Sequence, residues 1–260
     1  METWSAFLSE YTHYLPVLIR IASFWVALPV LSAGVPATLR AGFAGSVTLL
    51  VAPHLPRVSP PDDLAAYALL VLSEALVGLA MGLVVMTLLA AVQVAGQLID
   101  VPLGFSVAQV LDPHMGLDTP LVARFKFVVA LLVLFATDGH HMLLRAVVES
   151  FTALPVGSAV LRPEAAWVSV ESMGLMFVLA VRMAFPVAAA LFLADVALGL
   201  VARAVPQVNV FFLGIPVKSV LGVGVLMVVL PAFVRQLGAL FADGGDIASA
   251  LFELMGALRR

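Results

Sequence analysis

The amino-acid sequence predicts an all-α, membrane-associated helical bundle with kinked and interrupted hairpins, for three reasons. Of the 260 residues, 63% are hydrophobic and only 11% are charged, whereas roughly a quarter of the residues in a soluble domain are charged. The apolar residues form runs, several of which reach the roughly 20 residues that a helix needs to cross a hydrocarbon core. These runs lack the alternating polar face of barrel strands, so we expect helices to satisfy their backbone groups in lipid.

The predicted helices follow one another along the chain. The first, at residues 15–31, is preceded by two acids and no Lys or Arg, so we expect it to be retained rather than cleaved as a signal peptide. A short run at residues 41–52 precedes a proline-rich break, after which Ser59 or Asp62 is expected to cap the next helix. Further helices are predicted at residues 64–99, 121–136, 141–153, 173–201 and 208–234.

Turn residues separate these helices. Proline and glycine near an aspartate interrupt the apolar pattern at residues 100–104 and 112–120, and Pro-Val-Gly does so within residues 154–157. Asp138-Gly139 is predicted to close one helix and open the next. No long linker or low-complexity tract divides the sequence, so we expect a single domain over residues 1–260.

Charged residues inside the apolar segments are the first candidates for functional residues. Each costs at least about 2.5 kcal/mol at the centre of a bilayer if it faces lipid, so these residues are expected to face protein, water or the interface. Arg124 and Lys126 lie near the start of a segment, where long side chains can extend to the interface. The other charges leave a structural and a functional interpretation open; they are Arg20, Glu74, Arg182, Asp195 and Lys218.

Two further patterns concern packing and gating. Gly78 and Gly82 are spaced four residues apart, which lets another backbone come close, and packing within the same chain is the simplest use. The stretch at residues 100–120 is too long and too apolar for a solvated linker, so it is either a plug or lid, or a re-entrant loop that only packs. Between Gly104 and Gly116 it holds Phe105, Val110, Leu111 and Met115.

The sequence lacks the motifs of enzymes and cofactor-binding proteins. There is no cysteine, which excludes disulfides, thiolate metal sites and cysteine nucleophiles. His140 and His141 are adjacent and are expected to point different ways on a helix, so no metal site is predicted. No phosphate loop, dinucleotide motif or nucleophile elbow occurs, and a net charge of -3 without a basic run disfavours nucleic acid. We therefore predict a non-enzymatic protein without a cofactor.

Two stretches resemble a known family. The first covers residues 102–116 and continues at 120–125 and 138–141, and the second covers residues 198–218. Both resemble the FliR/SctT (SpaR) family of type III export-gate membrane proteins, and the resemblance covers nearly the whole of residues 15–233. Its most specific part contains Pro206, Gln207, Asn209 and Pro216. Asp138 departs from the pattern, because we expect Asn there in many relatives; the change preserves capping and adds a charge.

The resemblance implies a function and partners. Members of this family are non-enzymatic subunits of the export gate, in which a single copy assembles with several FliP-like and FliQ-like sister subunits into a conical pore for unfolded proteins. Further export-apparatus membrane subunits and the basal-body ring are implied as neighbours, in the bacterial inner membrane within the flagellar basal body. The chain is expected to look like a fusion of the sister folds, FliP-like over about residues 1–165 and a FliQ-like helical hairpin over about 166–250.

Carried over to this sequence, the resemblance makes residues 104–120 the plug of the closed pore. A bulky apolar loop can exclude ions by packing and dewetting, and then move aside for a substrate. The implied blocking side chains are Phe105, Val110, Leu111 and Met115, with Gly104 and Gly116 as hinges. Glu74, Arg182, Asp195 and Lys218 are expected to serve assembly.

The sequence leaves rival functions open. Asp112-Pro113, Gly214 and Gly222 favour the flagellar branch of the family, and an injectisome export-gate subunit is the alternative. A secondary transporter of a small solute would also use broken helices and intramembrane charges, although no inverted repeat is visible. A membrane-embedded hydrolase would need Ser, His and acid residues in a converging motif, which the sequence does not show.

Overall fold

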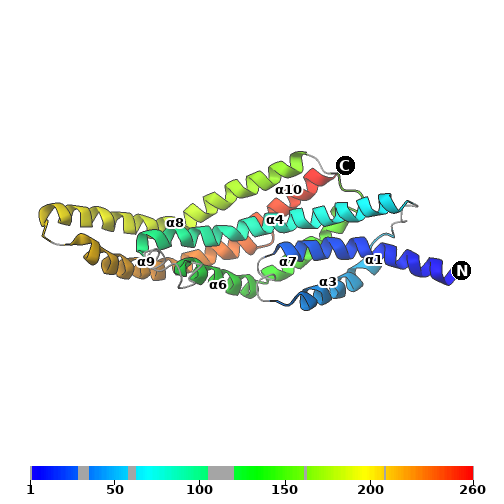
Figure 1. Cartoon of the computed structure of the whole chain (residues 1–260), viewed down its shortest axis with the longest axis horizontal. Coiled ribbons are helices and arrows are strands. Elements are labelled where there is room, and N and C mark those ends of the chain that lie inside the picture. The colour runs from blue at the N-terminus through cyan, green and yellow to red at the C-terminus, as the bar shows by residue number, and fades with distance from the viewer. Residues whose placement is uncertain are drawn as a thin grey trace. The chain divides into compact units, whose positions relative to one another are not determined.

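The computed structural model describes residues 2–28, 35–57, 63–104, 120–160, 163–207 and 209–259, and all regular secondary structure in these ranges is helical (Figure 1). The predicted all-α class is therefore confirmed. Ser59 and Asp62, the expected cap residues, lie outside the described ranges. The elements are α1 (Glu2–Ala27), α3 (Ala37–Val51), the 3-10 turn η1 (Ala52–His54), α4 (Leu64–Leu103), α6 (Leu121–Ala136), α7 (Gly139–Ala153), α8 (Pro163–Ala204), α9 (Val210–Phe241) and α10 (Asp246–Leu258).

The helices form two compact units, each built from separate parts of the chain. The first unit contains Met1–Thr87, Asp138–Met173 and Phe241–Arg260, and so combines α1, α3, α7 and α10 with the beginning of α4. The second unit contains Leu88–Thr137 and Gly174–Leu240, and so combines the end of α4 with α6 and most of α8 and α9. Helices α4 and α8 thus contribute residues to both units.

Three helical stretches are long and apolar enough to cross a membrane, as judged over the described residues. They are α4 with 40 residues, α8 with 42 residues, and the stretch Phe212–Leu258, which contains most of α9. Helices α6 and α7 have only 16 and 15 residues, which is short of the roughly 20 that a span needs. The expected mixture of spanning and short segments is therefore confirmed.

Pro102 does not end α4 where the sequence pattern predicted a break. Helix α4 continues through Asp100 and Pro102 to Leu103, although residues 100–104 were expected to interrupt it. Pro102 falls in the last turn, where only one helical hydrogen bond is lost. The helix ends instead at Gly104, whose backbone φ of 85° is left-handed and whose N–H bonds to the carbonyl of Val101.

The C-terminal helix α10 was not expected from the sequence. It starts after Gly244, which has a φ of 82°, and it packs against α7 in the first unit (Figure 1). Its buried residues recur at helical spacing, as Ile247, Leu251, Leu254 and Leu258 show. Asp138 lies between α6 and α7 in the left-handed region, with a φ of 55°, as predicted for the junction of the two helices, but its side chain makes no capping hydrogen bond, so the expected capping is wrong.

Candidate functional site

A buried ion pair lies at the centre of the first unit. Nε of Arg20 on α1 donates to Oε2 of Glu74 on α4 at 2.5 Å, and neither side chain has exposed surface. The guanidinium also lies 4.3 Å from the ring centre of Phe151 on α7. A charge that is buried away from solvent needs a close opposite charge. Arg20 and Glu74, which are 54 residues apart in sequence, provide it for each other.

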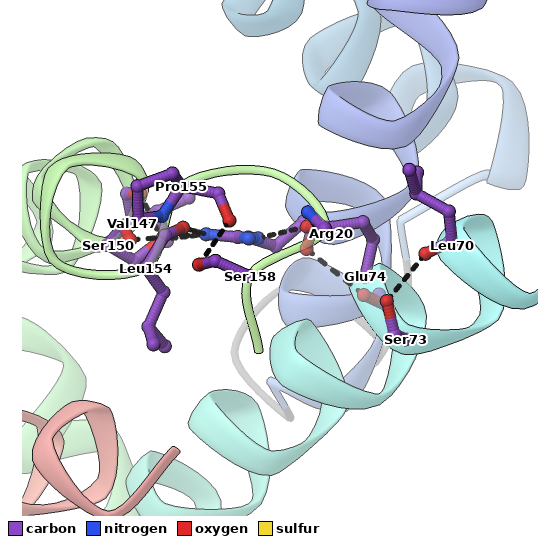
Figure 2. Close-up of polar contacts among 11 residues, drawn as sticks. Arg20, Leu70, Ser73, Glu74, Val147, Ser150, Leu154, Pro155 and Ser158 are labelled. Atoms are coloured by element: carbon purple, nitrogen blue, oxygen red, sulfur yellow. Dashed lines mark hydrogen bonds and ion pairs between the residues drawn. The ribbon is translucent and has the colours of Figure 1, made fainter. Parts of the chain in front are cut away.

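The same pair holds the end of α7 and the turn that follows it. Nη1 of Arg20 donates to the carbonyl oxygens of Leu154 at 2.9 Å and Ser150 at 3.2 Å. The other carboxylate oxygen of Glu74 accepts a hydrogen bond from the N–H of Gly157 at 2.8 Å. Figure 2 shows the Arg20 side chain reaching from Glu74 toward Ser150 and Leu154. Ser150 lies in the last turn of α7 and Leu154 is its C-cap residue, so the cation lies at the C-terminal end of the helix, where it is favourable.

Close contact between α1 and α4 brings the pair together. A Cβ atom on Gly78 would collide with the carbonyl oxygen of Arg20, and one on Gly82 would lie 2.8 Å from the carbonyl oxygen of Phe24. Glycine at both positions therefore lets the two backbones touch. The predicted use of this glycine pair in packing within the chain is confirmed.

In the second unit, Asp100 joins the two helices that flank residues 105–119. Its carboxylate oxygens accept hydrogen bonds from the N–H groups of Val122 at 2.9 Å and Ala123 at 3.0 Å. These N–H groups lie in the first turn of α6, where Pro120 at the cap position offers no side-chain hydrogen bond. Asp100 thus caps α6 from another helix.

The C-terminal end of α4 is also fixed to α9 within this unit. The hydroxyl of Ser219 donates to the carbonyl oxygen of Leu103 at 3.2 Å. The fully buried Leu103 side chain packs so closely on Gly222 that an added Cβ there would collide with it. Gly104, a predicted hinge, follows directly. The other predicted plug residues lie outside the described ranges; they are Phe105, Val110, Leu111, Met115 and Gly116.

Lys126 is buried, which corrects the expectation that it reaches an interface. Its Nζ donates to the carbonyl oxygen of Met183 at 3.3 Å and lies 4.4 Å from the ring centre of Phe233. None of the ion pairs between described residues includes it. Helix α6, which carries Lys126, is not one of the candidate spans. Burial lowers the pKa of Lys126 from 10.5 to about 8. Arg124 is exposed, as expected for a residue near a helix start.

The remaining predicted charges have different surroundings. Nζ of Lys218 on α9 lies 2.8 Å from Oδ1 of Asp195 on α8, so these two residues form an ion pair within the hairpin. The Asp195 side chain is 48% exposed and that of Lys218 is 20% exposed. Arg182 is exposed and, unlike Glu74, is not buried within the chain. Whether these four residues serve assembly stays a prediction.

The family motif lies at the turn between α8 and α9. Pro206 and Gln207 form the turn, and the side-chain oxygen of Asn209 accepts a hydrogen bond from the N–H of Phe212 at 3.4 Å. Asn209 therefore caps the start of α9. Pro216 lies inside α9, and all four residues are exposed.

A small cluster at the start of α7 was not expected. The ring centres of His140 and His141 are 4.1 Å apart. The two side chains therefore lie against each other, contrary to the expectation from the sequence that they point different ways. With Asp138 they offer ligand atoms within 4.8 Å of one another. The carboxylate of Asp138 already contacts Nδ1 of His141 at 3.2 Å, and both side chains are well exposed. The distances alone would allow a metal ion, but exposed acidic groups such as Asp138 are common without one, so the expected absence of a metal site stays a prediction.

Comparison with known proteins covers both units. The family model described as "Bacterial export proteins, family 1" matches residues 11–244. The flagellar biosynthetic protein FliR of Bacillus subtilis (strain 168) is 37% identical over 94% of this chain and 95% of that protein. FliR of Escherichia coli (strain K12) is 30% identical over 93% and 92% of the two chains. FliR of Caulobacter vibrioides (strain ATCC 19089 / CIP 103742 / CB 15) is 31% identical over 85% and 90%.

Proposed function

The chain belongs to family 1 of the bacterial export proteins and is a FliR homologue, and from this premise we propose that it is a subunit of the protein-conducting gate of the flagellar export apparatus. The observation that carries the proposal is the similarity to FliR over 94% of this chain and 95% of the relative. The chain is non-enzymatic, as this family membership shows. The three candidate spans among the described residues are consistent with the bacterial inner membrane.

The gate requires neighbouring subunits, for which the second unit offers a large apolar surface. Phe185 and Phe192 on α8 and Phe212 on α9 are each exposed by about two thirds or more of their surface, at 65%, 66% and 72%. FliP-like and FliQ-like subunits, further export-apparatus membrane proteins and the basal-body ring are the partners in this proposal. Such neighbours would bury these side chains, and unfolded export substrates would pass between subunits.

The plug of the closed gate is residues 104–120 in this proposal. The contacts around that segment support it, because Asp100 fixes the start of α6 and Ser219 fixes the end of α4. Both ends of the segment are therefore attached to packed helices. Gly104 has a positive φ and can act as a hinge at the first of these ends.

The relation to the sister folds is also part of the proposal. Helices α8 and α9 form a hairpin that turns at Pro206 and Gln207, and this hairpin is the FliQ-like portion over about residues 166–250. The preceding part, about residues 1–165, is FliP-like. The relatives compared above are flagellar proteins, which favours a flagellar gate over an injectisome gate or a small-solute transporter.

Affinity purification from native membranes tests the assembly. An affinity-labelled full-length chain is expected to bring down FliP-like and FliQ-like subunits in fixed ratio, together with export-apparatus components. The same label on an unrelated inner-membrane protein is the control. Recovery of the chain alone, with transport of a small solute in liposomes, would contradict the proposed function.

A further inference from the structure

Arg182 is a cation on an exposed apolar face of α8. We infer that this face docks against an apolar helix of a neighbouring subunit, and that this helix places an Asp or Glu side chain opposite Arg182. The inference rests on the proposed function, because it concerns the surface through which the chain joins the gate. It goes further by naming the docking surface and the chemistry that the partner must supply.

The position of Arg182 along α8 explains why it needs a partner. The helix has 42 residues, and at a rise of about 1.5 Å per residue both of its ends lie about 30 Å from Arg182. An arginine side chain cannot extend over that distance to reach either end. Arg203, by contrast, lies in the last turn of the same helix, close to its end.

The residues around Arg182 form a shallow groove of apolar side chains on the surface of α8. Phe177, Val178, Val181 and Phe185 line this groove together with the arginine. All four are more than half exposed, at 59%, 53%, 53% and 65%. Val178, Val181 and Phe185 follow the spacing of three and four residues that a helix presents to another helix in a groove.

The positive charge of Arg182 indicates that a helix bound in this groove carries a negative charge. Among the described residues, ion pairs join Arg20 to Glu74, Arg145 to Asp243 and Lys218 to Asp195, but none includes Arg182. Lipid alone would leave an arginine without a partner in an apolar surface, which is costly. The carboxylate of a partner helix would accept two parallel hydrogen bonds from the Arg182 guanidinium, while apolar residues of that helix fill the groove.

Site-specific photocrosslinking tests which molecule covers the groove. Benzoylphenylalanine replaces Phe185 in the full-length chain, and the gate is purified from membranes after irradiation. The inference expects a crosslink to one apolar helix of a sister subunit, with an Asp or Glu within about one turn of the crosslinked residue. The same replacement at Phe252, which is exposed on α10, is the control and is expected to give a different product. Crosslinks only to lipid, or to a helix without an acid, would overturn the inference.

Charge exchange then tests the pair itself. Arg182→Glu is expected to lower recovery of the assembled gate about tenfold or more, because two acids would face each other in a buried site. Changing the identified partner acid to Arg should restore recovery, and the matched variant Arg203→Glu should assemble normally. Normal assembly of Arg182→Glu, or failure of the exchange to restore it, would overturn this inference alone. Failure of the unaltered chain to assemble with sister subunits would instead overturn the proposed function.

Discussion

Arg20 and Glu74 form an ion pair whose two side chains have no exposed surface, and together they bind the end of α7 and the turn that follows it. A buried ion pair does not by itself make a protein more stable, because both charges lose their water. Removing only one of the two charged side chains is nevertheless severely destabilising, since the remaining charge stays buried. The pair therefore specifies how α1, α4 and α7 pack in the first unit.

Replacing one member of this pair should be more harmful than replacing both. Glu74→Leu is expected to cost about 3–5 kcal/mol, because it leaves the Arg20 guanidinium buried without its carboxylate. The double variant Arg20→Met with Glu74→Leu should recover part of that loss, because no charge stays buried, although the carbonyl oxygen of Leu154 and the N–H of Gly157 lose these partners. Thermal unfolding of the purified gate in detergent measures the difference, with Glu171→Gln on the exposed surface of α8 as control. Equal stability of Glu74→Leu and the unaltered protein would refute this role.

Substitutions at Gly82, where α4 touches α1, and at Gly42, which has open space around it on α3, are predicted to have opposite effects. Gly82→Ala should destabilise the protein, because the new methyl group would lie 2.8 Å from the carbonyl oxygen of Phe24. Gly42→Ala on α3 meets no atom within 4 Å, so it should gain roughly 0.5–1 kcal/mol from the better helix propensity of alanine. The melting temperatures of the two variants, each compared with that of the unaltered protein, test both predictions. Similar shifts for both would show that backbone contact at Gly82 is unimportant.

The sequence predicted helices more completely than it predicted contacts. Apolar runs indicated most helices, and the spacing of Gly78 and Gly82 indicated a close approach of helices, because both patterns are local. The partners of Glu74 and Asp100 could not be predicted, since they lie 54 and 22 residues away along the chain. Hydropathy likewise placed Lys126 near a helix start but could not show that Met183 and Phe233 cover it.

The ion pair between Asp195 and Lys218 should stabilise the hairpin of α8 and α9. Because the Asp195 side chain is 48% exposed in the single chain, we expect a coupling of about 0.2–1 kcal/mol in a double-mutant cycle. Exchanging the two residues, Asp195→Lys with Lys218→Asp, should restore motility that either single reversal lowers. Full motility of both single reversals would show that the contact is dispensable.

Lys126 should make stability depend on pH. Its pKa in the folded protein is lowered to about 8, below the ordinary 10.5, so the unfolded chain binds more protons between these values. Stability contributed by this residue should therefore rise with pH between about 8 and 10.5. Lys126→Met should remove that rise and should be more stable than the unaltered protein near pH 7. Identical melting curves for both proteins across this range would contradict the assignment.

If this chain is part of a closed protein-conducting gate, ion conductance through the assembled gate is the most direct test of that function. Deleting residues 105–115, while keeping Gly104 and Gly116, should raise the conductance of reconstituted gates well above that of the unaltered complex. The deleted complex must still contain its sister subunits, which the same purification verifies. Conductance equal to that of the unaltered gate would show that these residues do not close a pore.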